Sequence, residues 1–359
     1  MQTRNLKTYK YVHIINNDKF IRPFIDFIEK YFVMDEHLFL FLDDNRDNIF
    51  PIPKKENIFK VPFVYTKIYN TILLSKYING YIQKADKIFI HGLFQKVTLR
   101  FLFFNQKKLS NYFWIVWGGD LYSYQRLKKK PYKYYEIVMK KKVISKLGGI
   151  ICYNKEEYDL VKEWYGAEGK FLQSFFYTSN VCQCFDTPYV PSGKILNIQI
   201  GNSADPSNNH YEILDKLKPF KDQDIHIYAP LSYGNEKYAE KLISYAKKIF
   251  GHKFIPIVDY MTLEDYLMFL SKINIAIFAH DRQQAMGNII NLLCQGKTVY
   301  LRNTVTPWSL FKDIGIEVLD FNHFLLRELT KQTSQNNSKQ AQNYFSENNL
   351  VQQWKEILK

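Results

Sequence analysis

Short apolar runs that end in polar or glycine-bearing segments recur along the first half of the chain. The runs typical of buried strands cover residues 12–15, 38–42, 88–90, 113–116 and 149–153. Helical spacing marks residues 20–32, and a further helix is expected from about Asn154, with Glu156 and Glu157 in its first turn, where negative charge suits the helix dipole. Strands that alternate with helices predict a parallel α/β domain.

The same alternation restarts after residues 186–194, whose two prolines, glycine and serine predict a domain boundary. Strands are expected at 195–200, 225–229, 254–258, 273–279, 298–301 and 317–319. Helices are expected at 211–217, 237–250, 263–270, 288–294 and near Leu310. This second series predicts a doubly wound domain.

Two further segments follow the second domain. Residues 330–343 are rich in Gln, Asn and Ser and predict a polar connector. Leu350, Val351, Trp354, Ile357 and Leu358 recur with helical spacing, so we expect an amphipathic helix that crosses back to the first domain. The predicted organisation is therefore a first domain over 1–188, a second over 189–330, and a connector with a final helix over 331–359.

Charge is distributed unevenly between the two domains of this globular chain of 359 residues, 46% of them hydrophobic. Its net charge is +14, with 30 basic against 18 acidic residues in 1–190 and 19 against 17 in 191–359. The first domain thus carries +12. Unless this excess serves solubility alone, it predicts a polyanionic partner: a membrane surface, a nucleic acid or an acidic substrate.

The cysteines and the apolar runs bear on metal binding and on the compartment. Four scattered cysteines (Cys152, Cys182, Cys184 and Cys294) lack the second pair or the histidines of a zinc site, so we expect no metal and four thiols in a reducing compartment. The first apolar run is too short for a signal peptide, and no run approaches a membrane span. We expect a cytosolic protein that can sit on a membrane.

Two loops of the second domain predict an anion site, because both follow strands and the carboxyl ends of parallel strands are where ligands bind. The first is 201–210, where Gly201 permits close backbone approach and Ser207 or Asn208 can cap the next helix; an ordinary capped turn is the alternative. The second is 280–289, where Arg282 offers a planar fork suited to phosphate and Gly287 allows access to helix amides; a solvated loop is the alternative.

Two residues of the first domain are candidates for proton transfer. Asp120 lies on a glycine turn after the strand 113–116 and is expected to face a cleft between the domains, where a carboxylate can accept a hydroxyl proton. His91 ends the preceding strand in the same layer. A turn or cap role for Asp120 and a structural role for His91 are the alternatives.

A basic and aromatic stretch extends from Arg126 to Lys146. Tyrosines accompany its cations, which include Arg126, Lys128, Lys129, Lys130, Lys133, Lys140, Lys141 and Lys142, against the single acid Glu136. Each cation near an anionic bilayer is worth roughly 1 kcal/mol, so this stretch predicts reversible membrane binding. Single-stranded nucleic acid and a solvated helix face are the alternatives.

Three motifs of this chain resemble glycosyltransferase family 56, the TDP-N-acetylfucosamine:lipid II N-acetylfucosaminyltransferases. They are Gly201-Asn202-Ser203-x-Asp205-x-Ser207-Asn208-x-His210, Arg282-Gln283-Gln284-x-x-Gly287 and Trp117-Gly118-x-Asp120-Leu121-Tyr122. The resemblance implies a GT-B glycosyltransferase of two Rossmann-like doubly wound domains that face each other across a cleft. His280 and Gly119 stand where relatives carry Asn and Ala.

The resemblance also implies the ligands and the location. It implies a dTDP-sugar donor, an undecaprenyl-diphosphate-linked glycan acceptor and a peripheral place on the cytoplasmic face of the bacterial inner membrane. Its donor residues fall on Gly201, Asn202, Ser203, Arg282, Gln283, Gln284 and Gly287, and its base on Asp120.

We expect the donor diphosphate to lie between the 201 loop and the loop from His280 to Asn288, with Tyr260 and Met261 near the base. No cofactor and no nucleic-acid partner are expected. The alternatives are a non-catalytic binder of nucleic acid or anionic lipid, and a nucleotide-sugar epimerase of the same fold.

Overall fold

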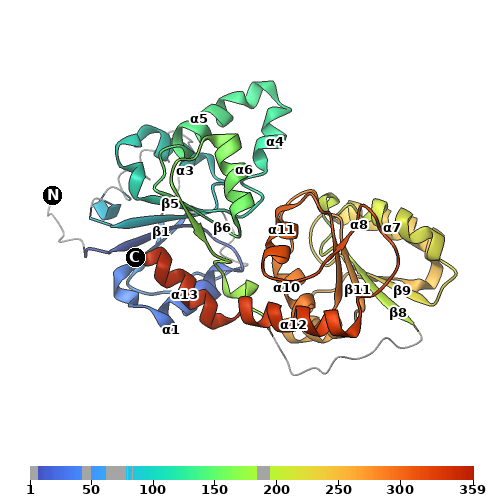
Figure 1. Cartoon of the computed structure of the whole chain (residues 1–359). Helices are drawn as coiled ribbons and strands as arrows, with labels where there is room; N and C mark the ends of the chain where they lie inside the picture. The colour runs from blue at the N-terminus through green and yellow to red at the C-terminus, as the bar shows by residue number, and fades with distance from the viewer. Residues whose placement is uncertain (1–6, 43–49, 62–77, 79, 83, 184–194) are drawn as a thin grey trace. The chain divides into compact units, whose positions relative to one another are not determined.

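The computed structural model describes the chain except for residues 1–6, 43–49, 62–77, 79, 83 and 184–194 (Figure 1). It divides into two compact units: unit 1 comprises Met1–Ser179 with Leu350–Lys359, and unit 2 comprises Asn180–Asn349. Each unit is built on its own parallel sheet. The predicted boundary at 186–194 lies outside the described residues, and the units divide between Ser179 and Asn180, earlier than predicted.

Unit 1 contains a seven-stranded parallel sheet of order β3-β2-β1-β4-β5-β6-β7. Its strands are β1 (Tyr11–Asn16), β2 (His37–Leu42), β3 (Ile58–Val61), β4 (Lys87–His91), β5 (Tyr112–Ile115), β6 (Gly149–Cys152) and β7 (Lys170–Gln173). Every residue of β1 and β2 is buried. Continuous burial is typical of a parallel sheet that helices cover on both faces.

Alternate residues of β1 point to the two helical layers of unit 1. Val12 and Ile14 join the core cluster that α3 (Lys96–Phe104), α5 (Tyr134–Ile144) and α6 (Lys155–Tyr165) help to form. His13 instead lies against Phe24 of α1 (Ile21–Tyr31) and Trp354 of α13 (Glu347–Leu358). Figure 1 shows α1 and α13 together on the opposite side of the sheet from α3, α5 and α6. The period-two alternation of a strand thus sorts the core into two layers.

Unit 2 contains a six-stranded parallel sheet of order β10-β9-β8-β11-β12-β13. Its strands are β8 (Leu196–Ile200), β9 (Ile225–Pro230), β10 (Phe254–Ile257), β11 (Ile275–Phe278), β12 (Thr298–Leu301) and β13 (Leu319–Asp320). Its helices are α7 (His210–Leu217), α8 (Glu236–Phe250), α9 (Leu263–Ser271), α10 (Met286–Cys294), α11 (Thr306–Asp313) and α12 (Lys331–Tyr344). This strand order is that of the dinucleotide-binding Rossmann fold, so the predicted doubly wound domain is confirmed.

The C-terminal helix crosses back to unit 1, as its apolar spacing predicts. Trp354 is fully buried, its ring lies 4.9 Å from that of Phe24, and its Nε1 donates a 3.0 Å hydrogen bond to the Phe176 carbonyl. Burial of a large aromatic side chain stabilises the helix on the sheet more than its own helix propensity does.

The polar segment expected to be a connector is instead a helix, α12. Its buried face carries Ser334 and Asn337. Both ends of the Asn337 amide bond the backbone of Glu317, at 2.9 and 2.7 Å. Because side-chain hydrogen bonds replace apolar contacts on this face, the hydrophobic period that reveals most helices is weak here.

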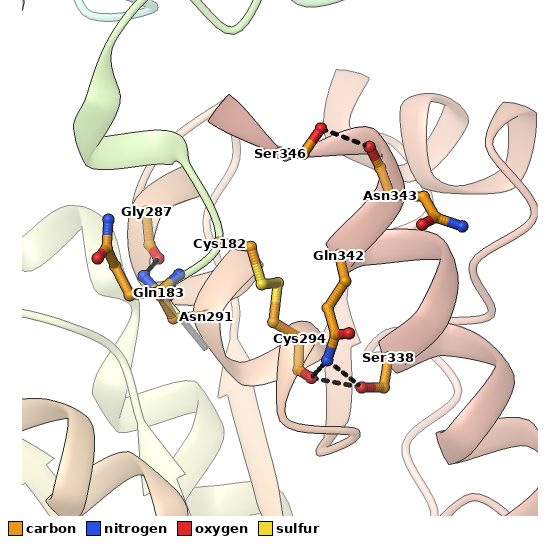
Figure 2. The surroundings of a disulfide bond; sticks show 9 residues. All are labelled: Cys182, Gln183, Gly287, Asn291, Cys294, Ser338, Gln342, Asn343 and Ser346. Atoms are coloured by element: carbon orange, nitrogen blue, oxygen red, sulfur yellow. Dashed lines mark hydrogen bonds between the residues drawn. A yellow bond between two sulfur atoms is a disulfide. The ribbon is translucent and has the colours of Figure 1, made fainter. Parts of the chain in front are cut away.

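A disulfide joins Cys182 to Cys294, at the end of α10, so the expectation of four separate thiols is wrong for this pair (Figure 2). The partners are 112 residues apart in sequence, and they meet because the segment that enters unit 2 runs past α10. Gln183 N also donates to Asn291 Oδ1 at 2.9 Å. Cys152 is free and buried, and Cys184 lies outside the described residues.

Replacement of Trp354 tests the packing of α13. Trp354→Ala removes a fully buried ring and is expected to lower the free energy of unfolding of unit 1 by about 3–5 kcal/mol. Urea unfolding followed by circular dichroism measures this loss. Gln352→Ala, at an exposed position of the same helix, is the control and should change the value by less than about 0.5 kcal/mol. Equal midpoints for both variants would contradict the packing.

Candidate functional site

The two predicted anion-binding loops of unit 2 lie side by side. They follow β8 and β11, which are neighbours in the sheet and mark the point where the strand order reverses. Gly201 N donates to the Ile277 carbonyl at 3.0 Å, which joins the end of β8 to β11. In open α/β sheets this switch point is where ligands bind.

One buried side chain, Asn208, fastens the two loops to each other. Its Oδ1 accepts hydrogen bonds from Asn202 N at 2.9 Å and from His280 Nε2 at 3.0 Å. Its Nδ2 donates to Ser203 O, Ser203 Oγ and Asp205 O, at 3.0–3.2 Å. A second hydrogen bond between the two loops is donated by Ser207 Oγ to Gln284 Oε1, at 3.0 Å. The loops therefore form one structure.

Because the Asn208 oxygen can only accept, His280 must carry its proton on Nε2. Burial, helped by the charge of Arg282, lowers the pKa of His280 to about 3, so the imidazole is neutral at pH 7. His280 is 3% exposed. It thus positions the loop from within, rather than offering a charge to a ligand.

Gly201 has a φ of +60°, and its missing side chain leaves space that the loop needs. A Cβ there would lie 2.4 Å from His210 Nε2 and 2.7 Å from Asn208 Oδ1. Glycine is therefore required at this position both for its conformation and for its size.

Two buried polar atoms beside Gly201 lack a hydrogen-bond partner among the described residues: Asn202 Oδ1 and His210 Nε2. Gln199 Nε2 bonds the Gly201 carbonyl at 3.0 Å, so its amide lies against this turn. An unsatisfied buried polar group costs about 1–3 kcal/mol. Polar groups kept in this state are typical of a site that a ligand or water completes.

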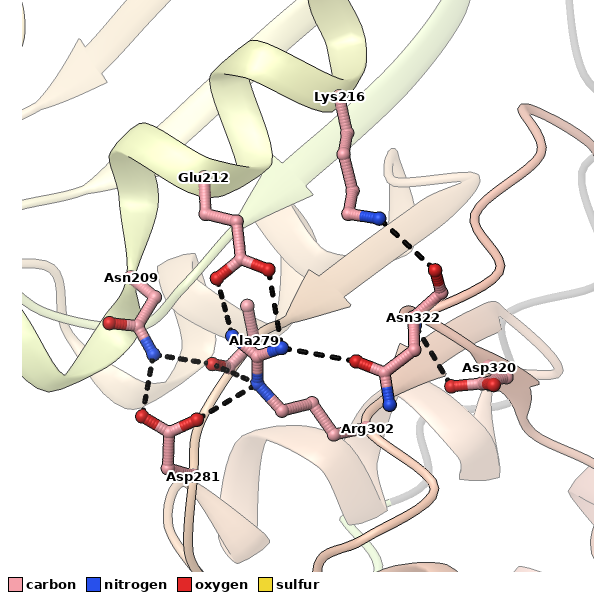
Figure 3. A network of polar contacts seen from close by, with 8 residues as sticks. All are labelled: Asn209, Glu212, Lys216, Ala279, Asp281, Arg302, Asp320 and Asn322. Carbon is pink, nitrogen blue, oxygen red and sulfur yellow. Dashed lines mark hydrogen bonds and ion pairs between the residues drawn. The ribbon is translucent and has the colours of Figure 1, made fainter.

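Arg302, which sequence reasoning missed, braces the loops from the next strand. It follows β12 and pairs with Glu212 of α7 and with Asp281, at 3.0 Å from the latter's Oδ1 (Figure 3). Its Nε also donates to the Ala279 carbonyl at 3.1 Å, and Asn209 Nδ2 bonds the same carbonyl at 2.8 Å. The only sequence signal was an arginine directly after an apolar strand.

The other predicted donor residues occupy the second loop and the start of α10. Arg282 is half-buried and its Nη1 donates to the Gln283 carbonyl at 3.0 Å, while the Gln283 side chain is itself buried. Gly287 and Asn288 lie in the first turn of α10, which has no side-chain cap. Uncapped amides at a helix start suit an anion.

Tyr260 and Met261 lie between β10 and α9, and the Tyr260 side chain is 85% exposed. Burial raises the pKa of Tyr233, and Tyr260 is close enough to add to this rise. Tyr233 OH accepts a 2.9 Å bond from Asn202 Nδ2. Tyr260 thus lies on the β9 and β10 side of the site and is not part of the core.

In unit 1, the Asp120 carboxylate is buried and fully hydrogen-bonded. Leu93 N and Trp114 Nε1 donate to Oδ2, both at 2.7 Å, while Trp117 N and Leu121 N donate to Oδ1 at 3.0 and 2.9 Å. Burial raises the pKa of Asp120, and these donors oppose the rise. Asp120 is 1% exposed, so the structure assigns it to holding the loop after β5, and the expected role as base has no support from its surroundings.

His91 belongs to a buried chain of side chains that ends at Trp117. His91 Nδ1 lies 2.7 Å from Tyr177 OH, and Trp117 Nε1 donates to the same oxygen at 2.8 Å. On its other side His91 Nε2 lies 3.0 Å from His13 Nδ1, and His13 Nε2 lies 3.0 Å from His37 Nδ1. Burial lowers the pKa of His91 to about 3. Its surroundings give His91 a positioning role, and they do not support the expected catalytic one.

The cations of the basic stretch are accessible to solvent, with one exception. Lys140 is buried, and its Nζ donates to the Asp120 carbonyl at 3.0 Å and to Ser123 Oγ at 2.8 Å, so this lysine is not available to a membrane. The other predicted cations are at least partly exposed: Arg126, Lys128, Lys129, Lys130, Lys133, Lys141 and Lys142.

Two Rossmann-like units in one chain are the architecture of the GT-B class of glycosyltransferases, and the chain has this fold. The chain belongs to the family described as 4-alpha-L-fucosyltransferase glycosyl transferase group 56, whose model matches residues 65–359. This membership replaces the alternatives of a non-catalytic binder and of an epimerase. The protein transfers a sugar from a nucleotide donor.

Solved structures share the fold at low identity. A glycosyltransferase from Rickettsia africae has a TM-score of 0.63 at 13% identity and covers 98% of both chains. Sucrose-phosphate synthase from Thermosynechococcus elongatus has a TM-score of 0.68 at 9% identity, over 97% of this chain and 98% of its own. Anabaena HepE, solved with UDP and glucose, has a TM-score of 0.63 at 12% identity, over 98% and 99%.

Replacement of Gly201 tests the cradle. Gly201→Ala is expected to weaken dTDP binding at least about tenfold, or 1.4 kcal/mol, because the new methyl group displaces His210 and Asn208. Titration calorimetry measures this change. Gly251→Ala is a matched control, since Gly251 also has a positive φ (+57°) but nothing within 4 Å of its Cβ position. Equal dTDP affinity in the two variants would exclude the 201 loop from the site.

Proposed function

We propose that this glycosyltransferase moves a fucosamine-type deoxysugar from a dTDP-sugar to a polyprenyl-diphosphate-linked glycan, in the synthesis of a bacterial surface polysaccharide. The family description, which names a fucosyl group, supports a deoxysugar donor. The observation that carries the donor part is the joining of the 201 and 282 loops through Asn208, beside an uncapped helix start.

Transfer breaks the bond between the anomeric carbon and the diphosphate oxygen and forms a bond from that carbon to an acceptor hydroxyl oxygen, whose proton passes to the departing diphosphate or to water. Negative charge therefore develops on the leaving group. We place the diphosphate between the 201 loop and the start of α10. There the Arg282 guanidinium and the amides of Met286 and Gly287 would stabilise that charge. Preorganised donors cost little reorganisation during the reaction, and the fastening by Asn208 and Arg302 provides that order.

A donor panel tests the reaction. With a polyprenyl-diphosphate-linked oligosaccharide as acceptor, product is expected from dTDP-N-acetylfucosamine and not from UDP- or GDP-sugars. Arg282→Ala should lower kcat about 10²–10³-fold, the usual effect of losing one charge-stabilising donor. Arg327→Ala is the control. Arg327 lies close in sequence to Leu329, whose N–H bonds Thr298 at the amino end of β12, and this end of the sheet is opposite to the proposed donor site.

Preference for a UDP- or GDP-sugar would contradict the proposed donor. Wild-type turnover in Arg282→Ala would exclude the arginine from leaving-group stabilisation.

The location we propose is the cytoplasmic face of the inner membrane, bound peripherally. In the part of the chain that the structure describes, no helix has both the length and the apolar character to cross a bilayer. The supporting surface is the exposed stripe of α5, where Tyr134, Tyr135 and Val138 share a face with Lys141 and Lys142. Tyrosines beside lysines are typical of a surface that contacts anionic lipid headgroups.

Glu136, the single acid between residues 126 and 146, is buried and neutralised within the protein. Glu136 pairs with Lys96 at 2.6 Å. Burial alone would raise the pKa of Glu136, but the hydrogen bonds from Lys96 and Tyr135 and the charges of Lys96 and Lys133 together outweigh it, and the pKa is lowered. The pair removes a repulsive charge from the surface that we propose faces the membrane.

Liposome binding tests this location. Replacement of Lys128, Lys129, Lys141 and Lys142 by Gln, which removes the two lysines of the α5 stripe and two exposed lysines before it, is expected to weaken co-sedimentation with anionic vesicles at least about tenfold, since each cation contributes roughly 1 kcal/mol. The matched control removes four exposed lysines of α8, namely Lys237, Lys241, Lys247 and Lys248, and should change binding little. Equal losses in both variants would show that net charge alone, and not this surface, governs binding.

A further inference from the structure

Trp117, at the carboxyl edge of the sheet of unit 1, is hydrogen-bonded through both its backbone and its indole ring. Trp117 N donates to Asp120 Oδ1 at 3.0 Å, and its indole Nε1 donates to Tyr177 OH at 2.8 Å. The first acceptor is the buried Asp120 carboxylate. The second, Tyr177, is hydrogen-bonded to the buried series of histidines from His91 to His37. Buried polar groups are costly unless fully paired, so this much polar support for one half-exposed ring indicates that its position matters.

Two further rings meet Trp117 from neighbouring strand ends. Phe94, after β4, lies 5.7 Å from Trp117 between ring centres, and Phe20, after β1, lies 5.9 Å away, both edge to face. The Phe94 side chain is 48% exposed, and Phe20 and Trp117 are partly exposed. We call these three residues the aromatic platform.

The backbone below Phe94 is shaped to receive its ring. A Cβ at Gly92, whose φ is +77°, would lie 2.6 Å from Phe94 Cε2, and one at Gly119 would lie 3.4 Å from Phe94 Cε1. Gly92 therefore has to remain glycine for the ring to lie where it does. One side of the Phe94 ring thus packs against the backbone of two glycines and the other side is exposed. An ordinary surface phenylalanine does not need such glycines beneath it.

A carboxylate completes the surroundings. Asp18 lies two residues before Phe20 in the turn that leads into α1, where Ile21 N bonds its carbonyl at 3.0 Å. Burial raises the pKa of Tyr177 well above its ordinary value, and the nearby charge of Asp18 adds to the rise. Asp18 is therefore close to the tyrosine that holds Trp117.

We propose that the aromatic platform, with Asp18 beside it, binds a sugar ring of the acceptor glycan. A pyranose has an apolar C–H face, which the electron-rich face of an aromatic ring attracts, and hydroxyl groups that a carboxylate can accept. Half-exposed rings next to a carboxylate match both features, whereas a polyprenyl chain offers no donor for Asp18. The inference rests on the proposed function, because it takes the acceptor to be a glycan.

Binding to an array of soluble bacterial oligosaccharides, followed by calorimetry with the oligosaccharide bound best, tests the proposal. Phe94→Leu and Trp117→Phe should each weaken binding about tenfold, and Asp18→Ala should weaken it as well. Phe104→Leu is the matched control, since Phe104 is 73% exposed on α3, and it should bind as the wild type does. The dTDP affinity of all variants should stay unchanged.

Three results would overturn the platform: no oligosaccharide bound by the wild type, unchanged binding in Phe94→Leu, or a Phe94-dependent affinity for farnesyl diphosphate in place of any glycan. The dTDP measurement separates this failure from that of the proposed function. A protein that binds glycans through Phe94 but no dTDP would contradict the donor and leave the platform intact.

Discussion

The arrangement of the 201 and 282 loops, which we propose as the donor site, depends on the hydrogen bonds of one buried amide. Asn208 bonds its own loop through Asn202, Ser203 and Asp205, and bonds the neighbouring loop through His280. Because Asn208 is itself fully buried and its hydrogen bonds fix both loops, the backbone around Gly201 has little freedom. The same contact fixes the proton of His280 on Nε2, while burial keeps the imidazole neutral, so the formal positive charge of this loop is that of Arg282.

In unit 1, buried polar groups likewise fix a position, here that of the aromatic residue Trp117. Asp120 and His91 are the residues whose chemistry first suggests proton transfer, and the structure engages both in holding Trp117, through its backbone and through Tyr177. A carboxylate with four N–H donors is a strong organiser of backbone because its capacity to accept is used in full. The same saturation makes it a poor acceptor for a substrate proton.

Much of the fold could be predicted from the sequence, because parallel strands that are buried on both faces appear as short apolar runs. The positions of the 201 and 282 loops at the carboxyl ends of their strands were also predictable, since each loop follows such a run and carries Gly, Asn, Ser or Arg. The sequence gives no sign of the contacts between them. Asn208 bonds His280 across 72 residues and Arg302 bonds Glu212 across 90 residues, and no local pattern reports such pairings.

The misses have a common physical origin in long-range polar contacts. Helix α12 buries Asn337 and Ser334 in place of apolar residues, Lys140 is buried against the Asp120 carbonyl, and Cys182 meets Cys294 across 112 residues. The polar residues are of types usually found at the surface, and hydrogen-bond partners that only the folded chain supplies allow their burial. The two cysteines likewise meet only in the folded chain.

The central claim is that the donor diphosphate lies in the cradle formed by the 201 loop, Arg282 and the start of α10. A crystal structure of the protein with dTDP tests it directly. The account predicts phosphate oxygens within hydrogen-bond distance of the Arg282 guanidinium and of the amides of Met286 and Gly287. Phosphates bound anywhere else, for example on the lysines between residues 126 and 146, would contradict it.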